Sequence, residues 1–187
     1  MEIRALIREV IYQYSQEYGK GVPKTKLLKL VYLVELFYKR RYGERLTDAK
    51  WVYYLYGPYL HEYNELLDDV QIEGKEFGFA EDKEATMYTV KSVYKNEGVH
   101  GDLKFLIKKI IHEYGKMELR DLLEYVYFET EPMINAENRG EVLDFGNTMP
   151  EEYYKIKPLT IDAQTERILR RNFKKRVEAA RGNKRNT

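Results

Sequence analysis

Cysteine is absent from this chain of 187 residues. Disulfide bridges and thiolate metal sites are therefore excluded, and a chain of this length can bury a core without them. Serine occurs twice, at Ser15 and Ser92, and neither lies in the glycine-flanked turn that presents a serine nucleophile. The three histidines, His61, His100 and His112, do not share the spacing of metal ligands. We therefore expect no enzyme activity, no metal and no cofactor.

Long apolar runs are missing as well. The longest apolar-rich stretch, residues 27–38, contains Lys29 and Glu35 and is shorter than the roughly 20 residues that span a bilayer. The first eight residues carry charges at helical spacing and lack the apolar stretch of a signal peptide. These features predict a soluble, cytoplasmic protein. Scarce cysteine and serine beside abundant charged residues are also typical of a thermophilic source.

The charge is small in total but unevenly distributed along the chain. The net charge is +1, yet residues 165–187 carry nine basic and two acidic side chains, which leaves the other residues at about −6. Two interpretations of this basic tail stay open. It either contacts nucleic acid without sequence specificity, through Arg170, Arg171, Lys174 and Lys175, or it is a solubilising tail.

Hydrophobic periodicity predicts a mainly α fold with a small antiparallel sheet, an α+β arrangement with winged-helix-like elements. Apolar residues at a spacing of 3.6, with glycine, proline or capping residues at the ends, predict helices over 3–18, 24–42, 59–70, 102–114, 118–131 and from 160 onward. Aromatic and β-branched runs predict strands over 51–56, 72–80 and 85–93. We expect a helical domain over residues 1–158 and a basic helix and tail over 159–187.

Two consecutive stretches carry a family signature: TKLLKLVYLVELFYKRRYGERL, and after it DAKWVYYLYGPYLHEYNELL. This order, a Lys-Leu-x-Lys-Leu-x-Tyr helix, a Tyr-Gly, a strand, Tyr-Gly-Pro and then Tyr-Asn, resembles the Panacea (SocA-like) antitoxin family. The similarity is clear over residues 24–67, about a quarter of the chain. The matching positions are Lys26, Leu27, Lys29, Leu30, Tyr32, Tyr42, Gly43, Tyr56, Gly57, Pro58, Tyr63 and Asn64.

The resemblance implies that the protein is an antitoxin, which binds a toxic partner protein directly and in some members delivers it to a protease. Many members carry Thr-His…Pro-Trp in a later helix. At the comparable place this chain has Phe128-Glu129-Thr130-Glu131-Pro132-Met133 and lacks the histidine and tryptophan.

Tyrosine, used 18 times, and the lysines of the second helix are the candidate binding residues. Tyrosine combines a large contact area with a polar tip and is enriched at interfaces. We expect an exposed patch around Tyr56, Tyr59 and Tyr63, although about half of the nearby tyrosines should belong to the core. The lysines either complement an acidic partner or are merely solvated. The candidate partner-binding residues are Lys26, Lys29, Tyr32, Tyr56, Gly57, Pro58, Tyr59, Tyr63 and Asn64.

The Tyr56-Gly57-Pro58 sequence has a structural interpretation beside the functional one, a fixed corner that ends a strand and starts a helix. The alternative function is that of a transcription regulator, because three helices followed by a hairpin resemble a winged helix. The segment in the position of the recognition helix, residues 59–70, carries four acidic residues and no lysine or arginine. DNA would repel such a helix, so neutralisation of a partner protein is the preferred prediction.

Overall fold

The computed structural model describes residues 1–150 except 70, 80–82, 92, 93, 95–98 and 100. The chain divides into two units, Met1–Pro150 and Glu151–Thr187, of which the second lies outside the described residues. The predicted domain boundary after residue 158 and the predicted basic helix beyond it therefore stay predictions.

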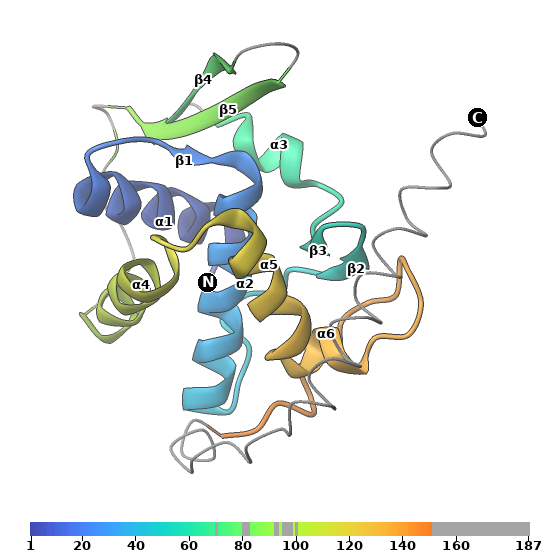
Figure 1. Ribbon diagram of the computed structural model, residues 1–187. Coiled ribbons are helices and arrows are strands. Elements are labelled where there is room, and N and C mark those ends of the chain that lie inside the picture. The colour runs from blue at the N-terminus through green and yellow to red at the C-terminus, as the bar shows by residue number, and fades with distance from the viewer. Residues whose placement is uncertain (70, 80–82, 92–93, 95–98, 100, 151–187) are drawn as a thin grey trace, which may run out of the picture. The chain divides into compact units, whose positions relative to one another are not determined.

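The described part of the chain is mainly helical, with a small antiparallel sheet, which confirms the predicted fold class (Figure 1). Its helices are α1 (Ile3–Tyr18), α2 (Lys24–Tyr42), α3 (Tyr63–Leu67), α4 (Gly101–Tyr114), α5 (Leu119–Phe128) and α6 (Glu131–Asn135). Its strands are β1 (Val22–Pro23), β2 (Val52–Tyr54), β3 (Gly57–Tyr59), β4 (Ile72–Phe79) and β5 (Lys83–Val90).

Helix α2 is the centre of the fold, as its nearly continuous apolar surface predicts. Every residue from Leu27 to Leu36 is buried, including two charged ones, Lys29 and Glu35. Helices α1, α4 and α5 pack around it, and β3 lies against it as well. Over this stretch the helix has no solvent-facing strip, so its polar side chains must find partners inside the protein.

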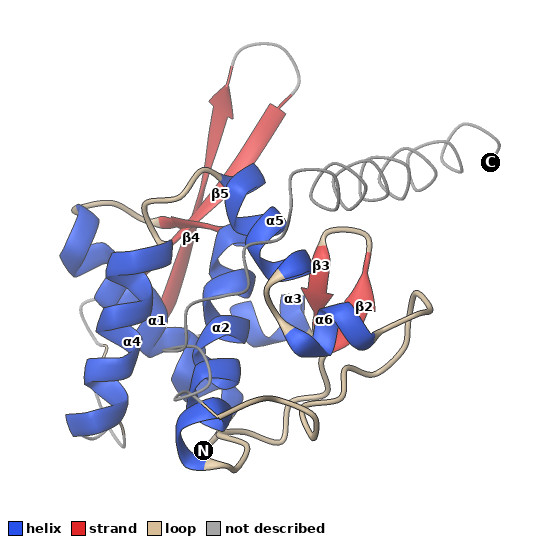
Figure 2. Cartoon of the chain, turned by 60° about the horizontal axis from the view of Figure 1, so that its bottom comes forward, coloured by secondary structure: helices blue, strands red, loops and turns tan. Residues whose placement is uncertain are grey.

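The sheet has the order β1-β5-β4 and is antiparallel throughout. The chain order is α1-β1-α2-β2-β3-α3-β4-β5, so that, apart from the β2–β3 hairpin inserted before α3, the arrangement is that of a winged helix. The β4–β5 hairpin is the wing and projects beyond the helices (Figure 2). Helix α3 occupies the position of a recognition helix but has five residues, because the predicted helix over 59–70 begins only at Tyr63 and ends at Leu67.

The sequence predicts that a helix starts after the Tyr56-Gly57-Pro58 corner. In the structure these residues instead fold back as strand β3. Strands β2 and β3 form a two-stranded hairpin in which Tyr54 pairs with Gly57 and Val52 with Tyr59. Gly57 adopts a positive φ of 84°, a conformation that glycine allows without steric cost. On its other side β2 is hydrogen-bonded to residues 140–143, so that a distant segment completes this small sheet.

The predicted helix over 118–131 is two helices, α5 and α6, separated at Glu129 and Thr130. The prediction that Pro132 ends the helix is wrong, because this proline lies in the first turn of α6. Proline is tolerated there, since the first backbone N–H groups of a helix have no acceptor within the helix. Thr130 adopts an extended conformation, and its carbonyl accepts the first hydrogen bonds of α6.

Candidate partner-binding site

Lys29 lies beneath the β2–β3 hairpin, on the face of α2 that the hairpin covers. Its side chain is 2% exposed, and its ammonium nitrogen Nζ donates a hydrogen bond of 2.8 Å to the carbonyl oxygen of Pro58. Burial lowers the pKa of Lys29 from 10.5 to about 7, because the charged form loses its hydration. The prediction that Lys29 is available to a partner is therefore wrong, since the hairpin itself occupies this lysine.

Tyr127 of α5 holds the turn of the hairpin from the other side. Its hydroxyl oxygen accepts a hydrogen bond of 2.8 Å from the backbone N–H of Gly57. The same hydroxyl lies 3.1 Å from the carbonyl oxygen of Tyr54 and 3.0 Å from that of Leu55. A side chain at Gly57 would also contact Lys29, whose Cε lies 3.4 Å from the ideal Cβ position. The Tyr-Gly-Pro motif is thus a clamped turn.

Three further motif residues are hydrogen-bonded within the protein, Tyr32 and Tyr63 in the core and Lys26 in a half-buried position. Lys26 donates to the carbonyl oxygens of Gly115 and Met117, at 3.0 and 2.7 Å, and so holds the end of α4. Tyr32 is fully buried and donates to the Thr130 hydroxyl at 3.0 Å. The Tyr63 hydroxyl donates to the Lys24 carbonyl at 2.9 Å. Tyr63 is 2% exposed, so its predicted place in an exposed patch is wrong.

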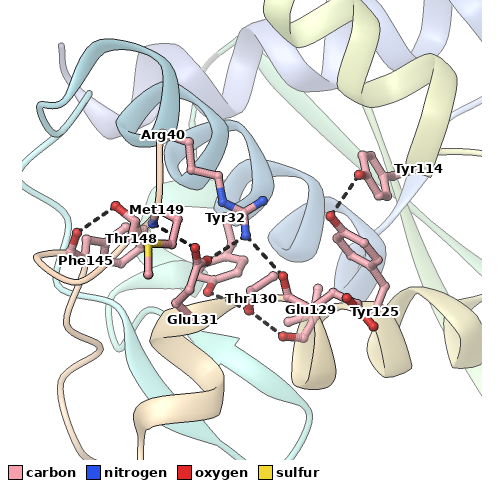
Figure 3. A network of polar contacts seen from close by, with 11 residues as sticks. Tyr32, Arg40, Tyr114, Tyr125, Glu129, Thr130, Glu131, Phe145, Thr148 and Met149 are labelled. Carbon is pink, nitrogen blue, oxygen red and sulfur yellow. Dashed lines mark hydrogen bonds and ion pairs between the residues drawn. The ribbon is translucent and has the colours of Figure 1, made fainter. Parts of the chain in front are cut away.

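Glu129, Thr130 and Glu131, in the stretch where the family's histidine and tryptophan are missing, belong to a polar network between α2 and α6 (Figure 3). Arg40 is almost fully buried, and its Nη2 contacts the Glu131 carboxylate at 2.6 Å and the Glu129 carbonyl at 3.1 Å. The second carboxylate oxygen of Glu131 accepts from the backbone N–H of Met149 at 2.9 Å. In this chain, an ion pair therefore connects the two helices at this place.

The solvent-facing side of the hairpin presents a row of one guanidinium and three rings. The Arg139 guanidinium lies 4.6 Å from the Tyr54 ring centroid, and the rings of Tyr54 and Tyr59 are 5.3 Å apart. His61 follows at 6.2 Å from Tyr59, with its ring nearly perpendicular. We call Arg139, Tyr54, Tyr59 and His61 the aromatic row. Beside it at the turn, Tyr56 is 54% exposed.

The predicted patch is therefore present in part and shifted. Tyr56 is exposed and Tyr59 is half-buried, as an interface residue should be, whereas Tyr54 and Arg139 take the place predicted for Tyr63. Pro58 is buried and contributes its carbonyl oxygen to Lys29. Asn64 is exposed on α3, and its backbone carbonyl accepts from the N–H of Asp68.

The surface of α3 is unsuited to a recognition helix. Tyr63, Leu66 and Leu67 point into the core, while Asn64 and Glu65 remain exposed. The Arg4 guanidinium, which lies close to this helix, is engaged by backbone carbonyls at its C-terminal end. This surface offers no charge that would neutralise a phosphate. The predicted nucleic-acid contacts Arg170, Arg171, Lys174 and Lys175 lie outside the described residues.

Within the described ranges, no three histidine, aspartate or glutamate side chains are placed to hold a metal ion. The same part of the chain has no helix long and apolar enough to cross a bilayer.

The fold and this surface define a class: a mainly helical domain of winged-helix topology, with a short helix α3 that contains no basic residue and an exposed aromatic hairpin. The sequence matches the family "Antitoxin SocA-like, Panacea domain" over residues 27–132, which is more than half of the chain. The chain belongs to this antitoxin family. Searches of curated proteins and of solved structures gave no significant match.

Two residues of the site could not be found from sequence. Arg139 lies about 85 positions after Tyr54, whose ring it covers, in a segment for which the sequence predicts neither a helix nor a strand. Tyr127 lies in a helix that contains a second tyrosine, Tyr125. Neither position carries a local signal, because the contacts form when β2 meets residues 140–143 and when α5 packs against the hairpin.

Proposed function

We propose that this protein neutralises a toxic partner polypeptide by binding it directly through the exposed side of the β2–β3 hairpin. The observation that carries the proposal is that some tyrosines near the hairpin are hydrogen-bonded inside the protein while others lie at its surface. Tyr32, Tyr63 and Tyr127 fix the scaffold by internal hydrogen bonds, whereas Tyr54, Tyr56 and Tyr59 remain available at the surface. Antitoxin family membership supplies the class of partner.

Inhibition by occlusion follows from the chemistry of this surface. Tyrosine rings bury a large area at a small entropic cost, so that a few of them can anchor an interface. The clamped turn preorganises them, because Lys29 and Tyr127 fix both the carbonyl and the N–H side of the Gly57-Pro58 pair. A preorganised surface loses little conformational freedom on binding, which favours affinity.

The test is a rescue experiment with a toxic partner, sought first in a short reading frame next to the gene. We expect coexpression with the wild type to restore growth, and the two proteins to copurify. Replacing both Tyr54 and Tyr56 by alanine should abolish the rescue and weaken binding by at least tenfold, since interface tyrosines each contribute about 1–2 kcal/mol or more.

Tyr42→Ala is the matched control, because Tyr42 is a similarly exposed tyrosine (39%) at the far end of α2. It should retain rescue and binding. Full neutralisation by the Tyr54→Ala/Tyr56→Ala protein, at equal soluble amounts, would place the contact surface elsewhere on the molecule.

A further inference from the structure

Arg139 is held in position by the backbone around it. The N–H of Gly140 donates to the carbonyl of Tyr53, and the N–H of Tyr53 donates to the carbonyl of Glu141, both at 2.8 Å. The Glu141 carboxylate accepts from the backbone N–H groups of Glu137 and Asn138, which closes the turn. Gly140 has a φ of 88°, so the turn also needs a residue without a Cβ. Arg139 is thus fixed next to β2 although its side chain is exposed.

The exposed Arg139 guanidinium is placed to bind an anion from solvent. It lies over the Tyr54 ring, and the attraction of a cation to the ring face holds it there without consuming its N–H donors. A guanidinium has five such donors in one plane, and their geometry matches both oxygens of a carboxylate. At the other end of the aromatic row, His61 is exposed beside Tyr59. The row therefore combines apolar ring surface with a cationic group at one end and an imidazole at the other.

We propose that the aromatic row recognises an acidic segment of the partner polypeptide, with a carboxylate bound by Arg139 and adjacent apolar side chains packed on Tyr54, Tyr56 and Tyr59. The inference rests on the proposed function and specifies its partner chemistry. It also replaces the lysines of α2, which were predicted to complement acidic groups, because Lys26 and Lys29 are hydrogen-bonded inside the protein. Charge complementarity selects an aspartate- or glutamate-containing segment over a basic or neutral one.

The experiment selects binders for the full-length protein from a random 12-residue peptide display library. We expect enriched peptides to carry aspartate or glutamate next to aromatic or aliphatic residues. Their affinity should fall about tenfold for Arg139→Gln, less for Arg139→Lys, and should weaken with added salt, since an exposed ion pair is screened. Arg120→Gln is the matched control, because Arg120 is an exposed arginine on α5, and it should leave binding unchanged.

A double-mutant cycle decides the assignment. For an enriched peptide, the change of its carboxylate residue to the corresponding amide should weaken binding to the wild type but hardly affect binding to Arg139→Gln. An equal loss of peptide affinity for the wild type and for Arg139→Gln would overturn the proposal. Enriched peptides without aspartate or glutamate, or enriched peptides whose affinity does not depend on Arg139, would overturn it as well. If Arg139→Gln still binds and neutralises the toxin while Tyr54→Ala/Tyr56→Ala does not, the carboxylate contact is wrong and the proposed function stands. If neither variant changes toxin binding, the proposed function itself is wrong.

Discussion

Lys29 shows how a single residue connects the core to the surface. Its ammonium group is buried at a cost, since charged groups are strongly hydrated, and a hydrogen bond to Pro58 offsets only part of that cost. The consequence is a pKa of about 7, which leaves the amine close to half protonated at neutral pH. A neutral amine still donates a hydrogen bond, so the contact with the hairpin does not depend on the charge.

The lowered pKa has a definite effect on stability. Between pH 7 and 10.5 the unfolded chain keeps a proton at Lys29 that the folded chain has lost, so falling pH favours unfolding. The free energy of unfolding should therefore rise with pH through this window, by up to about 1.4 kcal/mol per pH unit from this group. We expect Lys29→Met to lack this rise, as measured by urea unfolding at pH 6.5, 8 and 9.5.

Lys108→Met is the control for the pH experiment, because Lys108 is exposed on α4 and its replacement should preserve the wild-type pH dependence. A difference between wild type and Lys29→Met that is constant across this pH range would show that Lys29 titrates normally in the folded protein.

The β2–β3 hairpin is the element on which the proposed binding surface depends. It is short, and a two-stranded hairpin is marginally stable alone in water. Here contacts from other elements hold it: Lys29 from α2, Tyr127 from α5 and the backbone of residues 140–143. The geometry of the exposed tyrosines is therefore set by buried residues that never touch a partner.

Tyr127→Phe tests this dependence. Loss of the hydroxyl leaves the N–H of Gly57 without this acceptor, so the hairpin should open more often while the helices stay intact. We expect faster amide hydrogen exchange over residues 52–59, measured by mass spectrometry, and a loss of about 1 kcal/mol in the free energy of unfolding. Tyr125→Phe, on the same helix but hydrogen-bonded to Tyr114, should leave exchange in the hairpin unchanged. Equal protection in both variants would refute the clamp.

The ion pair between Arg40 and Glu131 connects helices α2 and α6. Glu131→Gln removes the charge that faces Arg40, a guanidinium whose side chain is 2% exposed. We expect a loss of about 3 kcal/mol in the free energy of unfolding, because the buried guanidinium then loses the negative charge of this partner. Asp121→Asn, which removes an exposed ion pair with Arg120, should cost less than about 1 kcal/mol. Similar small losses for both would indicate that water reaches Arg40.

At the scale of the whole molecule, the described residues combine winged-helix topology with a helix α3 that contains no lysine or arginine. The short α3 exposes Asn64 and Glu65, and its arginine neighbour is engaged by backbone carbonyls. Topology alone therefore does not assign function; the charges and side chains at the surface do.

We expect no sequence-specific complex with duplex DNA in gel shifts at moderate salt. The comparison is between the full-length protein and a variant with Arg170, Arg171, Lys174 and Lys175 replaced by glutamine. A complex that weakens steeply as salt rises, and that the fourfold variant does not form, would instead favour the DNA-binding regulator, because phosphate contacts release counter-ions.

The sequence by itself determined the helical class, the central position of α2 and the antitoxin family. These features follow from local periodicity, turn residues and a motif whose members are close in the chain. It also placed Tyr56 and Tyr59 near a candidate surface. It did not determine that Lys29, Tyr32 and Tyr63 face inward, because lysine and tyrosine carry a polar tip on an apolar stem and can lie either at a surface or in a core where that tip finds a partner.

The tertiary structure alone decided the site. Gly57 and Pro58 form a strand and not a helix start, since Lys29 and Tyr127 satisfy the backbone groups of the turn from two other elements. Arg139 joins Tyr54 because residues 140–143 pair with β2 across about 90 positions of chain. Such contacts depend on which distant segments pack together, and the local pattern of residue types does not predict that packing.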